Sequence, residues 1–114
     1  MTDSAFPVLV RAAIYSVVVL AVCRPLVKGR IKPNPFYGFR TAKTMSDARL
    51  WYLSNSYAAR QFSSGALVDL LWFGALYLTP LHNDAARYAN ACLIVIFASL
   101  LIAIVLTARY IKRL

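Results

Sequence analysis

From Ala89 to Ala108 the chain contains no charged side chain, and nothing there is more polar than Asn90, Ser99 and Thr107. A helix needs about 20 predominantly apolar residues to cross a hydrocarbon core of about 30 Å. The whole chain is 61% hydrophobic and 15% charged, whereas soluble domains are closer to half apolar and a quarter charged. The sequence therefore predicts an integral membrane protein.

Three segments come close to the length of a membrane span, namely residues 6–27, 63–81 and 88–111. The first contains Arg11 near its start and Arg24 near its end, so it spans only if both side chains extend to the interfaces. We therefore predict an all-α fold with three transmembrane helices, forming one module that comprises all 114 residues.

The distribution of basic residues predicts the orientation of these spans. The net charge is +9, and the positive-inside rule places the basic segments in the cytoplasm. The amino-terminal tail with Asp3 and the turn at 82–87 are then outside, which gives an N-out, C-in topology in a bacterial inner membrane. Orientation and anionic headgroups account for the charge, so no nucleic acid is expected as a partner. The basic segments contain Lys28, Arg30, Lys32, Arg40, Lys43, Arg49 and Arg60, and Arg109, Lys112 and Arg113.

Residues 28–62 connect the first two spans and are too few to form a core alone. Pro33 and Pro35 exclude a helix at the start of this connector. From Ala48 onward, polar and apolar residues recur with helical spacing, which predicts an amphipathic helix lying in the cytoplasmic interface. The chain is expected to turn near Gly65 into the second span, and the sequence leaves open whether the two helices are continuous.

Asp69 is the most unusual residue within the spans, because its neighbours are apolar. A charge at the bilayer centre costs roughly 2.5–3.5 kcal/mol on insertion scales, so a partner is expected. Arg24 and Arg109 lie at span ends on the same side as Asp69, and either can form an ion pair with it. The residues leave two interpretations open: a structural ion pair, or a proton or substrate site.

A stripe of small residues, Ser99, Ala103 and Thr107, recurs every four positions in the third span. Small residues allow another helix to approach closely. That helix can belong to the same chain or to a second copy in a homo-oligomer, and the sequence does not decide between them.

Nothing in the sequence favours catalysis or metal binding. Cys23 and Cys92 are expected near opposite ends of their helices, beyond the distance of about 7 Å between Cα atoms that a disulfide allows. His82 lies in a turn beside Asn83 and Asp84. No serine or cysteine has a nearby base, so we expect a protein without metal or cofactor that is not an enzyme.

The connector contains polar side chains able to cross-link a backbone and aromatic side chains able to anchor it. This set can tie the connector over the cytoplasmic mouth of the bundle, or it can bind a partner. Its members are Asn34, Tyr37, Gly38, Arg40, Thr41, Thr44, Trp51 and Asn55.

The spacing of this set resembles the signature of the SdpI family of small bacterial membrane proteins. The resemblance covers the run Asn-Pro-Phe-Tyr-Gly-Phe-Arg-Thr from Asn34 to Thr41, and the later Thr44, Trp51 and Asn55. The flanking apolar segments also fit the family's layout. The chain departs from the family where a proline often follows the Arg-Thr pair and where a glycine often stands at residues 58–59.

The resemblance implies a non-enzymatic immunity or signalling module. The founding member, which has further spans ahead of this module, protects its membrane from a toxic peptide and recruits a transcriptional repressor. The partners implied here are therefore the lipid bilayer, a peptide toxin and a cytoplasmic regulator. The residues alone leave an alternative open, a small oligomeric transporter or channel that uses Asp69.

Overall fold

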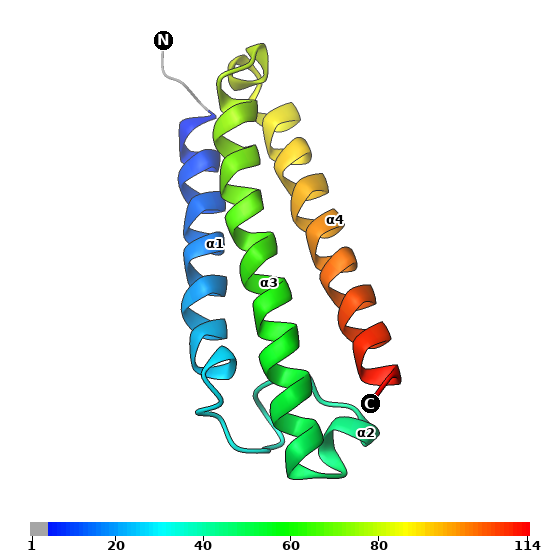
Figure 1. Cartoon of the computed structure of the whole chain (residues 1–114). Helices are drawn as coiled ribbons and strands as arrows, with labels where there is room; N and C mark the ends of the chain where they lie inside the picture. The colour runs from blue at the N-terminus through cyan, green and yellow to red at the C-terminus, as the bar shows by residue number, and fades with distance from the viewer. Residues whose placement is uncertain (1–4) are drawn as a thin grey trace.

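The computed structural model describes residues 5–114, so the orienting role predicted for Asp3 lies outside the described residues. The described chain is helical and elongated, with extents of 57 × 23 × 19 Å. Three long helices run antiparallel to their chain neighbours, and the start of α1 and the C-terminus lie at opposite ends (Figure 1). The elements are α1 (Phe6–Val27), α2 (Ala42–Met45), α3 (Ala48–Tyr77), the 3-10 helix η1 (Pro80–Asn83) and α4 (Ala85–Lys112).

Helix α1 has the bounds expected for the first span. Pro7 lies in its first turn, where a missing backbone N–H is not needed. The helix ends at Val27, and Gly29, which follows the C-cap residue Lys28, has a φ of +67° that glycine readily adopts. There the Gly29 N–H donates to the Leu26 carbonyl at 3.2 Å and the Arg30 N–H to the Pro25 carbonyl at 2.9 Å. This pair of bonds is a Schellman motif, and it turns the chain sharply at the helix end.

The course of helix α3 contradicts the prediction of a separate helix lying in the cytoplasmic interface. The segment 48–62 does not lie apart from the second span; it is the first half of one continuous helix of 30 residues. No turn occurs at Gly65, because a glycine in a helix interior costs only about 1 kcal/mol and Gly65 packs closely against α4. The apolar face assigned to lipid instead contacts protein, with Trp51, Ala58 and Ala59 all buried.

The connection from α3 to α4 also differs from the predicted boundaries. Helix α3 ends at Tyr77, before the expected 81, because Pro80 disfavours a helical conformation at Thr79. Helix α4 begins at Ala85, before the expected 88, because Asp84 caps it by accepting the Arg87 N–H at 3.2 Å.

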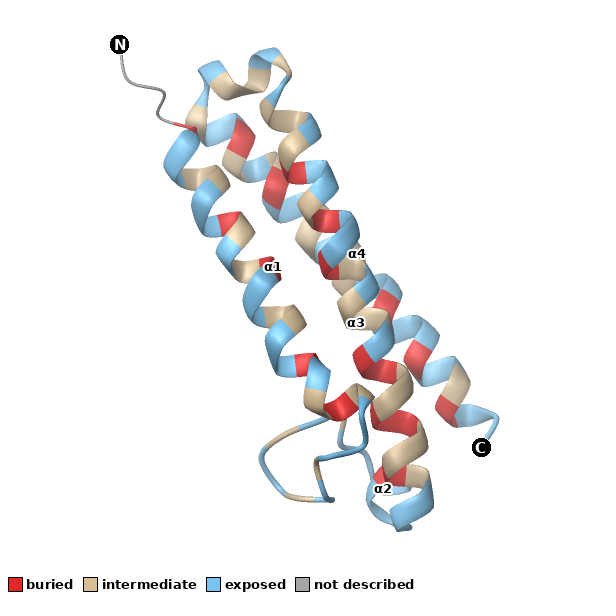
Figure 2. Cartoon of the chain, turned by 60° about the vertical axis from the view of Figure 1, so that its left-hand side comes forward, coloured by how far each residue is buried: buried red, intermediate tan, exposed pale blue. Residues whose placement is uncertain are grey.

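The core consists of two clusters along α3, which lies between α1 and α4 (Figures 1 and 2). At the η1 end, Phe73 and Tyr88 are fully buried, and the Tyr88 hydroxyl donates to the Phe73 carbonyl at 2.7 Å. At the other end Cys23, Leu26 and Ala59 form the second cluster. Tracts of buried residues on all three long helices therefore face the bundle interior.

The outer surface of the bundle is rich in large apolar side chains, such as Ile14 at 56% and Ile94 at 69% exposure. Among the described residues two helices, α1 and α4, are long and apolar enough to cross a membrane. Helix α3 is not one of them, although the sequence predicts a span in its second half. At 1.5 Å per residue α3 is about 45 Å long, more than a bilayer core requires.

The contact between Gly65 and Ser99 generates a test of the packing of α3 on α4. A Cβ atom at Gly65 would lie 3.5 Å from the Ser99 Cβ, whereas one at Gly74 would meet nothing within 4 Å. We expect Gly65→Leu to destabilise the bundle by about 1–3 kcal/mol through overpacking, and Gly74→Leu to leave it nearly unchanged. Thermal unfolding in detergent, followed by circular dichroism, measures both; equal melting temperatures for the two variants would contradict the close approach.

Candidate functional site

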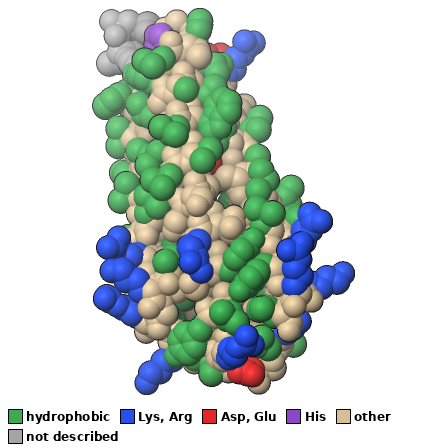
Figure 3. All heavy atoms as spheres, in the orientation of Figure 1, with side chains coloured by type: hydrophobic (Ala, Val, Ile, Leu, Met, Phe, Trp, Pro, Cys, Tyr) green, Lys and Arg blue, Asp and Glu red, His purple; other side chains and the backbone are tan. Residues whose placement is uncertain are grey.

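The basic residues gather at one end of the bundle, which contains the C-terminal ends of α1 and α4 and the start of α3. Figure 3 shows this concentration of Lys and Arg side chains over the lower half of the molecule. We call it the basic end. Its cations are Arg24 in the last turn of α1 and the ten predicted for the cytoplasmic side, Lys28, Arg30, Lys32, Arg40, Lys43, Arg49, Arg60, Arg109, Lys112 and Arg113. Among the described residues its one acid is Asp47, which caps α3 by accepting the Arg49 N–H at 2.7 Å.

Residues 28–47 form a folded cap over this end of α1 and α3. The first turn of the cap is built by Asn34, whose Oδ1 accepts the backbone N–H groups of Phe36 at 2.9 Å and Tyr37 at 2.7 Å. Its Nδ2 donates to the carbonyls of Lys32 at 2.8 Å and Tyr37 at 3.1 Å. One amide thus serves four backbone groups that no helix satisfies, and this fixes the extended segment around the two prolines.

The centre of the cap is the contact between Gly38–Phe39 and the start of α3. The Asn55 Oδ1 accepts the Phe39 N–H at 2.5 Å, and its Nδ2 lies 3.3 Å from the Phe39 carbonyl and 3.1 Å from that of Trp51. Gly38 has a φ of +120°, and a Cβ atom there would lie 2.6 Å from Asn55 Oδ1 and 2.9 Å from the Trp51 ring. Glycine is required here by both backbone conformation and space.

Three further side chains connect the cap and α3 to α1 and the segment after it. The Trp51 Nε1 donates to the Ile31 carbonyl at 2.9 Å, and the Ser56 hydroxyl donates to the Val27 carbonyl at 3.1 Å. The Tyr37 hydroxyl donates to the Val22 carbonyl. The carbonyls of Val27 and Ile31 lie at and after the end of α1 and have no helical partner, so these bonds satisfy them. The Val22 carbonyl lies within α1 and shares its helical bond with the Tyr37 hydroxyl.

The short helix α2 completes the cap through a capping box. The Thr41 hydroxyl accepts the Thr44 N–H at 3.2 Å, and the Thr44 hydroxyl accepts the Thr41 N–H at 2.8 Å. The buried Thr44 hydroxyl also lies 3.1 Å from the Phe39 carbonyl, which connects α2 to the Asn55 contact. Reciprocal bonds of this kind satisfy two otherwise unpaired donors.

Arg40 differs from every other member of the predicted set. It follows Phe39 and precedes Thr41, both of which are held by hydrogen bonds, yet its own side chain is exposed and forms no hydrogen bond or salt bridge with any described residue. The structure therefore brings together seven of the eight predicted connector residues, and the side chain of the eighth, Arg40, takes part in none of the cap's hydrogen bonds.

Sequence reasoning missed Ser56 and Gly29. Gly29 could have been recognised, because a glycine directly after a basic last turn is the usual signal for a helix C-terminus. Ser56 carries no such signal, since its acceptor lies 29 positions earlier in the chain.

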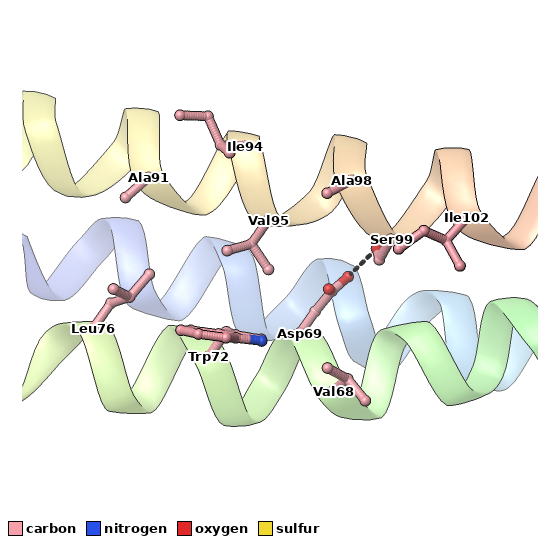
Figure 4. Close-up of a pocket in the computed structure, with 10 residues that line it drawn as sticks. All are labelled: Val68, Asp69, Trp72, Leu76, Ala91, Ile94, Val95, Ala98, Ser99 and Ile102. Carbon is pink, nitrogen blue, oxygen red and sulfur yellow. Dashed lines mark hydrogen bonds between the residues drawn. The ribbon is translucent and has the colours of Figure 1, made fainter.

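The predicted ion pair of Asp69 with Arg24 or Arg109 is wrong. Asp69 is only 1% exposed, and its Oδ2 accepts a hydrogen bond from the Ser99 hydroxyl at 2.9 Å (Figure 4). Arg109 lies ten residues beyond Ser99 on α4, about 15 Å along the helix axis, which is beyond the reach of its side chain. Arg24 is exposed in the last turn of α1 and, within the part of the chain described, forms no salt bridge.

The small-residue stripe of α4 is used inside the chain. Ser99 contacts Asp69 and lies opposite Gly65, while Ala103 and Thr107 are 3% and 0% exposed. A homo-oligomer would have to use another face, and it stays a prediction.

The cysteines and the histidine do not form a second site. Cys23 and Cys92 are buried free thiols in different core clusters. The His82 Nδ1 lies 2.6 Å from the Thr79 carbonyl within the turn. No group of three potential metal ligands occurs among residues 5–114.

An elongated helical bundle with an apolar outer surface, two helices long and apolar enough to cross a membrane and a basic cap at one end is typical of a small helical membrane protein. The chain belongs to the SdpI/YfhL protein family, whose model matches residues 30–110. This match covers nearly all of the cap, all of α3 and most of α4, so the resemblance predicted from the loop motif is confirmed. No curated protein and no solved structure matches the chain.

The Gly38 environment generates a test of the cap. We expect Gly38→Ala to open the cap, because the new Cβ would meet both Asn55 and Trp51 and because a φ of +120° is strained for alanine. Amide hydrogen exchange at Phe39 and Thr41 should rise by at least tenfold, which corresponds to about 1.4 kcal/mol of opening free energy.

Gly29→Ala is the matched control for this change. Gly29 has a φ of +67° and a nearest neighbouring atom at 4.0 Å, so alanine there costs about 1 kcal/mol at the end of α1. It should leave exchange at Phe39 unchanged. If Gly38→Ala exchanges no faster than Gly29→Ala, the cap is not held by this contact.

Proposed function

We propose that this chain is a three-span protein of the bacterial inner membrane that protects the membrane from a membrane-active peptide, with its cap in the cytoplasm as the surface for a soluble regulator. The observation that carries the proposal is that the motif residues differ in their contacts within the cap. Seven motif residues hold the cap, and Arg40 is exposed and is the one motif residue whose side chain forms no hydrogen bond or salt bridge with any described residue. A rigid support under a free guanidinium is suited to recognition, because a fixed Arg forms paired hydrogen bonds with a carboxylate or phosphate.

The third span in this proposal is the second half of α3. Helix α3 lies between the two apolar helices, and its exposed side chains from Leu67 to Trp72 are large and apolar. About 20 of its residues suffice to cross the bilayer. The remaining residues, about ten or nearly three turns, extend beyond the membrane, where the cap packs on them.

The orientation rests on charge. The cations of the basic end would face the cytoplasm under the positive-inside rule, and the turn with η1 would face outward. A toxin that arrives from outside would first meet this turn and the lipid-facing surfaces, while a regulator would meet the cap.

Cysteine accessibility tests the orientation. Lys43 and Asn83 are exposed at opposite ends of the bundle, so each can be replaced by cysteine and treated with a membrane-impermeant maleimide in spheroplasts. We expect Asn83→Cys to react in intact spheroplasts and Lys43→Cys only after permeabilisation. The wild type, whose two cysteines are buried, gives the background. Labelling of Lys43→Cys without permeabilisation would show that the cap faces outward, which is the reverse of the proposed topology.

Protection tests the role of the cap. Cells that express the chain should survive a membrane-active peptide that kills cells without it, and Arg40→Ala should abolish survival at an unchanged protein level. Arg40→Lys should retain little protection, because an ammonium keeps the charge but not the paired geometry. Trp51→Ala should also abolish protection, since it removes the bond to Ile31 and leaves a cavity under the cap.

Lys43→Ala is the matched control, because it removes an exposed cation from the same cap at a position three residues from Arg40. It should protect as well as the wild type. Full protection by both single variants, Arg40→Ala and Trp51→Ala, would show that the cap has no role in protection. Loss of protection in Lys43→Ala to the same extent would reduce the role of Arg40 to net charge.

A further inference from the structure

A groove runs between α3 and α4 in the part of the bundle that the cap does not touch. It has a volume of 430 Å³, and apart from Asp69 and Ser99 its lining is apolar, including Val68, Trp72 and Val95. Figure 4 shows these side chains arranged around the Asp69 carboxylate. The volume is within the range of sites that hold small molecules, which are mostly apolar with a few polar groups.

The Asp69 carboxyl group is incompletely satisfied. Its Oδ1 is buried and has no hydrogen-bond partner among the described residues, while its Oδ2 contacts Ser99. A buried polar atom without a partner costs about 1–3 kcal/mol, and the cost is higher where no water is present. Besides Ser99, the only other donor in the groove lining is the indole Nε1–H of Trp72, which forms no hydrogen bond with Asp69 Oδ1.

The hydrogen bonds of Ser99 define what the groove lacks. Its single hydroxyl proton lies between two acceptors, Asp69 Oδ2 and the Ile96 carbonyl, both at 2.9 Å. If Asp69 is ionised, both carboxylate oxygens are acceptors. If it is neutral with the proton on Oδ2, it donates to Ser99 and Ser99 donates to Ile96. In both arrangements Oδ1 is an acceptor without a donor, and with the proton on Oδ1 it is a donor without an acceptor. An amine satisfies each case, because its nitrogen donates when protonated and accepts when neutral.

We propose that this groove binds a compact apolar molecule that carries one amine, which enters from the lipid and donates a hydrogen bond to Asp69 Oδ1. An ammonium supplies the missing donor and also the counter-charge that no side chain of the groove provides. The apolar body contacts Trp72, Val95 and Ile102. This site is separate from the cap, and its occupation is measured without reference to protection.

The test uses the purified full chain in lipid nanodiscs and 1-adamantylamine as the probe. The chain has two tryptophans: Trp72 lines the groove and is 51% exposed, whereas Trp51 is fully buried in the cap contact. We expect a saturable change in tryptophan fluorescence that Trp72→Phe abolishes. 1-Adamantanecarboxylate, which has the same body and the opposite charge, should give no saturable change.

Two variants separate the carboxylate from the groove itself. Asp69→Asn should weaken binding of the amine by at least about tenfold, as expected for a hydrogen bond to a charged group. Asp84→Asn, which makes the same change at an exposed helix cap where asparagine serves equally well, should bind as the wild type does. Ala98→Phe fills the groove with Asp69 intact and should abolish binding, so the result does not depend on how well Asp69→Asn folds.

Several outcomes would overturn the proposal. Equal binding of the amine to wild type and Asp69→Asn, or of amine and carboxylate to the wild type, would mean that Asp69 selects nothing. Absence of saturable binding of the amine to the wild type would mean that the groove is not a binding site for it. A dimer that Ala98→Phe dissociates would show that a second copy of the chain fills the groove.

Discussion

The continuity of α3 through Gly65 is the constraint on which the rest of the structure depends. Because the helix does not turn there, its first turns extend past the end of α1 (Figure 1) and present Trp51, Asn55 and Ser56 to the end of α1 and the chain that follows it. Without this support, residues 28–47 would have no surface on which to fold, since a segment of this length cannot form its own core. Helix α3 is therefore both the centre of the bundle and the scaffold of the cap.

The cap uses polar side chains where a larger domain would use an apolar core. Asn34 and Asn55 each satisfy several backbone groups, and the Thr41–Thr44 box satisfies two more. Buried backbone groups must be paired, so a short connector can be ordered by a few well-placed amides and hydroxyls. This explains why the connector of this chain is rich in asparagine, threonine and aromatic residues, and Arg40 differs from them because its side chain has no such role.

The outcomes for individual residues show how far sequence reasoning reaches. The bounds of α1 agree with the sequence because the apolar segment 6–27 is itself the helix, and the local end signals Pro7 and Gly29, which the prediction did not use, lie at its two ends. The interfacial helix is wrong because helical periodicity reveals an apolar face without revealing whether lipid or protein covers it. The predicted partner of Asp69 is wrong because charge favours an arginine, whereas the rotation of α4 about its axis brings Ser99 next to the Asp69 carboxyl group.

The sequence by itself determined the apolar helices, the concentration of cations at one end and membership of the SdpI/YfhL family. These properties depend on composition and on spacing within about 30 residues, which are visible without a fold. Only the tertiary structure decided which motif residues hold the cap, that Arg40 is free, and that Asp69 faces a groove with one oxygen unpaired. Those results depend on the rotation and register of packed helices, because a hydrogen bond between residues 30 positions apart forms only when both side chains point to the same place.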